Sequence, residues 1–65
     1  MEAPLLEAWN QIAWAESLLD RGELARARTL ADEAASTGAA HGATGVERAA
    51  FLVMERLDAI TAAHR

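Results

Sequence analysis

The fold of this chain is decided around residues 14–35, which read WAESLLDRGELARARTLADEAA. Apolar residues recur every three or four positions on both sides of Gly22, which is the spacing of one face of an α-helix. A glycine just after a helix can adopt the left-handed backbone conformation that closes it. Arg21 suits the negative end of the first helix, and Glu23 suits the positive start of the second. The stretch therefore predicts two helices joined by a tight turn at Gly22.

The helix before this turn is predicted over residues 4–20. Pro4 suits its first turn, because the N–H that proline lacks would have no partner there. One apolar stripe along this helix, with Leu18 at its edge, is wide enough to face a core. The stripe consists of Leu5, Ala8, Ile12, Ala15 and Leu19.

The helix after the turn is predicted over residues 23–37, with Gly38 as its C-terminal stop. Its apolar face is made mostly of methyl groups, so a neighbouring helix can approach closely. The residues of this face are Leu24, Ala27, Ala31, Ala34 and Ala35. Residues 38–43 are predicted to form a bendable loop, because they include two glycines.

A third helix is predicted over residues 45–63. Thr44 and Glu47 have the spacing of a capping box, in which each side chain accepts from the backbone amide of the other residue. Phe51 and Leu52 lie on two other faces, away from the main apolar stripe. That stripe consists of Val46, Ala49, Ala50, Val53, Leu57 and Ile60.

Composition agrees with a single all-α domain over residues 1–65. Alanine, the best helix former, supplies 17 of the 65 residues. The helical segments and short joints predict a three-helix antiparallel bundle. A chain this short buries only about 60% of the surface that its unfolded state exposes. Because the chain has no cysteine, disulfides cannot stabilise so small a core. Association with a second copy or with a partner protein is the remaining way to stabilise it.

The formal net charge of −4 argues against nucleic acid and against anionic membrane surfaces as partners. No apolar run reaches the length of a transmembrane helix. The first residues lack the basic start of a signal peptide, so a cytoplasmic location is expected. All six basic residues are arginine, and with so much alanine this indicates a GC-rich bacterial genome.

The hairpin around Gly22 resembles a tetratricopeptide repeat. The turn consists of a glycine and an acidic residue, Gly22 and Glu23, and is preceded by Trp14, Ala15 and Leu18. Small or apolar residues follow it at the positions where the two helices of such a repeat cross. The resemblance covers roughly residues 8–35. This stretch is similar to repeats found in large bacterial regulators. The resemblance implies that the third helix begins a second repeat. Gln11 and Ala31 depart from the family pattern, which often has aromatic residues there.

Catalytic and metal-binding roles find little support in the sequence. His41 and His64 are far apart, and neither has a second histidine three or four residues away. The serines and threonines have no base at a recognisable spacing. Arg26 and Arg28 could belong to a DNA-reading helix, but nearby acidic residues offset them. We therefore expect no enzyme activity, no metal and no cofactor.

Large apolar residues outside the predicted stripes are the candidate protein interface. Trp9 and Trp14 point roughly 140° apart on one helix, so both cannot enter the same small core. Either one is core and the other covers a neighbouring helix, or one of them, Trp9 rather than Trp14, anchors an interface. Leu6 lies near Trp9. The candidate interface residues are Leu6, Trp9, Phe51 and Leu52.

The sequence predicts a non-enzymatic protein–protein interaction module that associates with itself through apolar helix faces. The alternative is a small acidic regulator that sequesters one specific protein, as antitoxins and anti-activators do. A third interpretation, a designed or excised piece of a repeat protein, also stays open.

Overall fold

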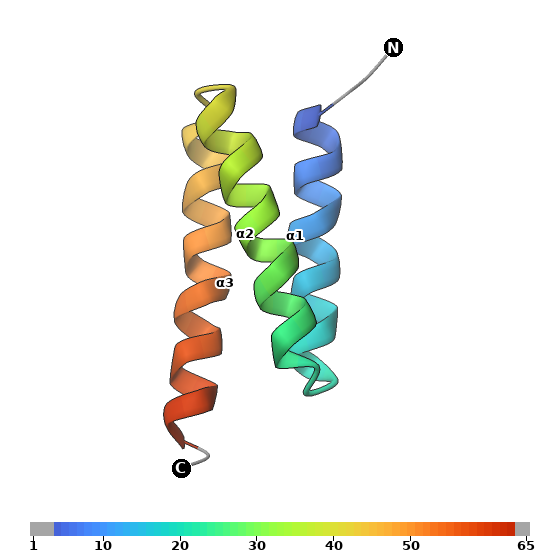
Figure 1. Ribbon diagram of the computed structural model, residues 1–65, viewed down its shortest axis with the longest axis vertical. Coiled ribbons are helices and arrows are strands. Elements are labelled where there is room, and N and C mark those ends of the chain that lie inside the picture. Colours follow the sequence, from blue (N-terminus) through green and yellow to red (C-terminus); the bar gives the residue numbers. More distant parts are fainter. Residues whose placement is uncertain (1–3, 64–65) are drawn as a thin grey trace.

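The computed structural model describes residues 4–63, which form three helices: α1 (Pro4–Asp20), α2 (Leu24–Ala40) and α3 (Thr44–Ala63). α1 and α3 run in the same direction, and α2 runs opposite to both (Figure 1). The bundle is elongated, with principal extents of 43 × 18 × 13 Å. The predicted all-α, three-helix antiparallel bundle is confirmed.

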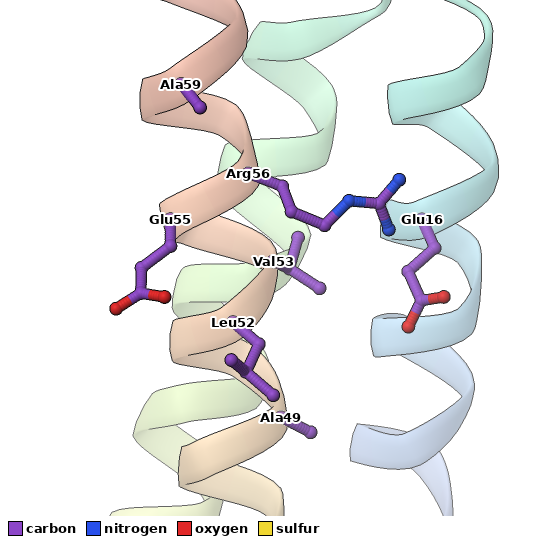
Figure 2. Close-up of a pocket in the computed structure, with 7 residues that line it drawn as sticks. All are labelled: Glu16, Ala49, Leu52, Val53, Glu55, Arg56 and Ala59. Atoms are coloured by element: carbon purple, nitrogen blue, oxygen red, sulfur yellow. The ribbon is translucent and has the colours of Figure 1, made fainter.

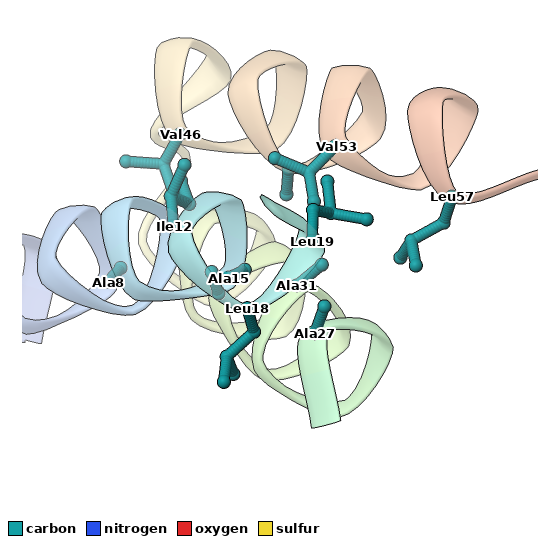
Figure 3. Close-up of a cluster of buried hydrophobic side chains, with 12 residues drawn as sticks. Ala8, Ile12, Ala15, Leu18, Leu19, Ala27, Ala31, Val46, Val53 and Leu57 are labelled. Atoms are coloured by element: carbon teal, nitrogen blue, oxygen red, sulfur yellow. The ribbon is translucent and has the colours of Figure 1, made fainter. Parts of the chain in front are cut away.

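The core lies where the three helices meet, and α2 packs extensively against both of the others. α1 and α3 supply its branched side chains, and Ile12 and Leu19 point from α1 toward α3 (Figure 3). The buried residues of α1 are Ala8, Ile12, Ala15, Leu18 and Leu19, and those of α3 are Val46, Ala50, Val53 and Leu57. The contiguous cluster that they form with α2 makes one hydrophobic core.

α2 contributes only small groups to this core. Its buried residues are Ala27, Ala31, Ala34 and Gly38. Because these side chains hold at most one methyl group, the branched side chains of α1 and α3 can approach the α2 backbone. The predicted methyl face of the middle helix is therefore correct, and it extends one further turn to Gly38.

The two joints have the same backbone geometry. At the first, the Gly22 N–H donates to the Leu19 carbonyl and the Glu23 N–H donates to the Leu18 carbonyl at 2.9 Å. These are the two hydrogen bonds of a Schellman motif. Gly22 has a φ of +80°, as the sequence predicts for the turn.

At the second joint, Gly42 takes the place that Gly22 has in the first, with a φ of +66°. The Gly42 N–H donates to the Ala39 carbonyl, and the Ala43 N–H donates to the Gly38 carbonyl at 2.8 Å. The prediction that Gly38 stops the second helix is therefore wrong. α2 continues to Ala40 because Gly38 is buried inside it against α3.

The start of α3 also differs from the prediction. Thr44 is already helical, and the Glu47 N–H donates to the Ala43 carbonyl at 3.1 Å. Ala43 thus occupies the N-cap position, and the expected capping box at Thr44 and Glu47 is wrong. The Glu47 side chain lies instead against α2, with its Cγ beside Gly38.

The register of α1 is shifted slightly from the predicted stripe. Leu18, expected at the edge, is 1% exposed, whereas Leu5, expected in the stripe, is 37% exposed. The shift follows from α2, which packs along the Leu18 side of α1 through the whole hairpin. Leu5 lies in the first turn, where less of the bundle covers it.

Candidate protein interface

The outer face of α3 carries two large exposed apolar side chains. Phe51 is 54% exposed and Leu52 is 56% exposed, at the middle of the helix. They lie away from the buried stripe, which contains Val53 and Leu57. Phe51 and Leu52 are therefore surplus to the core, as the sequence predicts, and are available for contact with another protein.

A shallow hollow of about 270 Å³ lies on this outer face. Phe51 and Leu52 form its apolar part, and Arg48 and Glu55 stand at its charged ends. Its complete lining is Thr44, Glu47, Arg48, Phe51, Leu52 and Glu55. An apolar centre with charged groups around it is the general composition of a protein interface.

A second, larger groove of about 500 Å³ runs between α1 and α3 (Figure 2). Leu52 borders this groove as well as the hollow on the outer face. Figure 2 shows Arg56 extending from α3 toward α1, where Glu16 lies. The α3 side of the groove is lined by Ala49, Leu52, Val53, Glu55, Arg56 and Ala59. Leu52 and Glu55 line both surface depressions and therefore join them.

Trp9 lies in the N-terminal half of α1, beside Gly45 in the first turn of α3. It is 46% exposed, and its Cζ2 atom is 3.8 Å from the place where a β-carbon on Gly45 would lie. One side of the indole therefore rests near the α3 backbone while the remainder faces solvent. A half-exposed tryptophan suits an anchor side chain, because tryptophan is enriched among the residues that contribute most to binding at protein interfaces.

Two further exposed apolar residues of α1, Leu6 and Trp14, differ in their surroundings. Leu6 is 62% exposed and lines neither the hollow on α3 nor the groove between α1 and α3. Trp14 is 54% exposed and lies on the α2 side of the bundle, in a hollow that includes Arg26 and Leu30. The interpretation in which one tryptophan belongs to the core is wrong, since both are half exposed.

Three ion pairs connect charged side chains of the described residues, and all three are exposed. Arg28 reaches Asp58 of α3 at 2.7 Å, Arg26 reaches Glu23 at 3.1 Å, and Arg56 lies 3.9 Å from Asp20. Exposed pairs of this kind contribute about 0–1 kcal/mol each to stability. Arg48 and Glu55 take part in none of these pairs, so their charges are free for another molecule.

Of the two histidines, only His41 lies within the described residues. His41 is exposed at the C-terminal end of α2, where its N–H donates to the Thr37 carbonyl. His64 falls outside the described residues, as do the first three residues, whose composition the location was predicted from. Within residues 4–63, no three histidine, aspartate or glutamate side chains are grouped as metal ligands.

The groove between α1 and α3 was not anticipated from the sequence. A signal for it exists, because Gly45, Ala49, Leu52 and Arg56 follow one another at spacings of four, three and four residues. This is a second helical stripe, adjacent to the buried one. Its small residues keep α3 open toward α1, and only the packing of the helices shows which neighbour the stripe faces.

Comparison of the chain with protein-family models, with curated protein sequences and with solved structures gave no match. The resemblance of residues 8–35 to a tetratricopeptide repeat therefore stays a prediction. None of the helices within residues 4–63 is sufficiently long and apolar to span a membrane.

Proposed function

We propose that this chain is a non-enzymatic protein–protein interaction module that associates with itself through the exposed apolar side chains of α3 and the adjoining edge of α1. The observation that carries the proposal is the exposure of Phe51 and Leu52 at the centre of α3, opposite a complete buried stripe. Neither residue is needed to close the core. Trp9 and Leu6 supply further apolar surface on α1.

Self-association is supported by the size of the chain. Small domains have marginal cores, and burial of further apolar surface against a second copy adds stability that the single copy lacks. Three of the four α2 residues in this core are alanines and the fourth is glycine, so little apolar volume is buried there. We propose in addition that the protein is bacterial and cytoplasmic, and that its first two helices form a repeat-like hairpin.

Analytical ultracentrifugation over a range of micromolar concentrations tests the proposal. The expected mass is at least twice that of the monomer, and Phe51→Ala is expected to shift association to higher concentration while helicity is kept. Trp14→Ala is the matched control, because Trp14 has the same 54% exposure but lies on the α2 side. Equal loss of association in both variants would contradict a site on α3.

A mass equal to that of the monomer at all concentrations would contradict self-association. The alternative would then be the better proposal, in which the acidic chain sequesters one other protein through the same apolar face. Its net charge of −4 favours a basic partner in that case.

A further inference from the structure

The charges at the centre of α3 are arranged as a mirror image of opposite signs. Residues 47–56 read ERAAFLVMER, with the midpoint between Phe51 and Leu52. Arg48 lies as far before this midpoint as Glu55 lies after it. Glu47 and Arg56 are related in the same way. Arg48 and Glu55 are seven residues apart and share one side of the helix, so two copies packed antiparallel about the midpoint would place Arg48 of each copy opposite Glu55 of the second copy.

The residues needed for such a contact share one face of α3. Positions spaced by three and four residues follow the outer side of the helix, which is the spacing used when two helices pack side by side. All of these positions are exposed. They are Thr44, Arg48, Phe51, Glu55, Ala59 and Ala62. They form a continuous seam, which we call the α3 seam, and Leu52 borders it on the side of α1.

We propose that a second copy of this chain docks on the α3 seam, with the two α3 helices antiparallel around a twofold axis that passes between Phe51 and Leu52. The proposal specifies the surface of the self-association proposed above, and it rests on that function. Phe51 of both copies lies at the centre of the contact, beside the hollow that Phe51 and Leu52 help to line. Arg48 of each copy faces Glu55 of the second copy.

Charge complementarity selects this orientation over a parallel one. In a parallel pair with the same residues at the centre, Arg48 would face Arg48 and Glu55 would face Glu55. Like charges in direct opposition disfavour such a contact. A twofold axis gives the favourable arrangement twice, since each contact in an isologous dimer occurs in two copies. Both side chains are exposed and free of ion pairs within the described chain.

The outer pair of mirrored charges contributes less. Arg56 already lies 3.9 Å from Asp20, and Glu47 is half buried against α2 near Gly38. The contact between Arg48 and Glu55 is therefore the main electrostatic determinant of the α3 seam, and it can be reversed by substitution.

Charge reversal in sedimentation experiments tests the orientation. Arg48→Glu makes both ends of the α3 seam acidic, and Glu55→Arg makes both ends basic. Each variant alone is expected to dimerise with a dissociation constant raised on the order of tenfold, because two attractions become two repulsions. An equimolar mixture of the two variants is expected to associate as the wild type does, since acidic ends then meet basic ends.

The double variant R48E/E55R serves as the control within one chain. The two positions are about 10 Å apart along the helix, too far for a direct pair in the same chain. Restored dimerisation in the double variant therefore reports a contact between copies. Circular dichroism on each variant shows that helicity is kept.

Cysteine cross-linking tests the same geometry by a second route, because the chain has no cysteine of its own. Thr44 and Ala59 are related by the same midpoint and are both exposed. A mixture of Thr44→Cys and Ala59→Cys is expected to form a mixed disulfide. Thr44→Cys alone is expected not to, because the two copies of residue 44 would be about 22 Å apart along the helix axis.

The outcomes separate the two proposals. A wild-type chain that stays monomeric overturns both of them. A wild-type dimer that charge reversal does not weaken, or that Thr44→Cys links to itself as readily as to Ala59→Cys, overturns the antiparallel seam and leaves self-association standing.

Discussion

Gly38 of α2 lies so close to Val46 of α3 that a β-carbon on the glycine would be 3.0 Å from Val46 Cγ1 and 3.1 Å from Val46 Cβ. Such a contact is tighter than nine in ten of those that real β-carbons make, so Val46 would have to move by a few tenths of an ångström. Val46 is 2% exposed and β-branched, so it has little freedom to move aside. The absence of a side chain at Gly38 therefore sets how near the end of α2 can lie to the start of α3.

Gly38→Ala is expected to destabilise the fold. Alanine improves helix propensity by up to about 1 kcal/mol, but overpacking a buried contact costs about 1–3 kcal/mol. We expect a net loss of about 1 kcal/mol in the free energy of unfolding, measured by urea denaturation at fixed protein concentration.

Gly45→Ala is the matched control for that substitution. Gly45 is also helical, but an added β-carbon would meet only Trp9 Cζ2, at an ordinary distance of 3.8 Å. The free energy of unfolding of the Gly45→Ala variant is expected to equal that of the wild type or to exceed it by up to about 1 kcal/mol. Similar effects of the two substitutions would show that contact with Val46 does not limit Gly38.

Gly22→Val is expected to lower stability through backbone strain alone. Gly22 has a φ of +80°, and an added β-carbon would meet no atom within 4 Å, so steric contact with the rest of the fold does not contribute. A β-branched residue in this region costs on the order of 1–3 kcal/mol. Gly22→Asn is expected to lose less, because asparagine tolerates the left-handed region. Thermal unfolding by circular dichroism measures both, and an unchanged melting temperature for valine would exclude the strain.

The helices themselves could be predicted from the sequence because their apolar spacing and high alanine content act locally. The bounds of α1 and the use of Gly22 as a turn follow from such local signals. The second joint could not be located in this way. Gly38 and Gly42 both satisfy the requirement for a helix-ending glycine, and only the tertiary contact of Gly38 with Val46 decides that Gly42 ends the helix.

In the candidate interface, too, some features follow from local sequence patterns and others depend on how the helices pack. Exposure of Phe51 and Leu52 follows from their angular distance to the buried stripe of α3, which the sequence contains. The positions of Trp9 and Trp14 depend on which sides of α1 are covered by α2 and α3. No local pattern specifies that arrangement, and for this reason the sequence leaves open a core position for one tryptophan, which the exposure of both residues excludes.

Tryptophan fluorescence provides a prediction for Trp9. In a Trp14→Phe variant only Trp9 emits, and its quenching by acrylamide is expected to fall as the protein concentration passes through the range of association. In a Trp9→Phe variant only Trp14 emits, and its quenching is expected to stay constant, because Trp14 lies on the α2 side. Quenching of Trp9 that does not change while the mass doubles would remove Trp9 from the interface.

The last prediction separates the core from the interface with two leucines of the same helix. Leu57 is 0% exposed and Leu52 is 56% exposed. Leu57→Ala is expected to cost about 2–5 kcal/mol of folding stability, as truncations of buried leucines do. In a domain with a core this small, that loss is enough to unfold much of the population.

Leu52→Ala is expected to leave helicity unchanged and to weaken association. Circular dichroism and light scattering on both variants provide the two measurements. Loss of helicity in Leu52→Ala with intact assembly would mean that the core and interface roles have been exchanged. If folding and assembly are coupled, helicity and mass both fall for both variants. The dependence of helicity on protein concentration then distinguishes the core residue from the interface residue. High protein concentration would restore the helicity of Leu57→Ala only in part, whereas it would restore that of Leu52→Ala fully, because Leu52 contributes to the contact between copies and not to the packing within one.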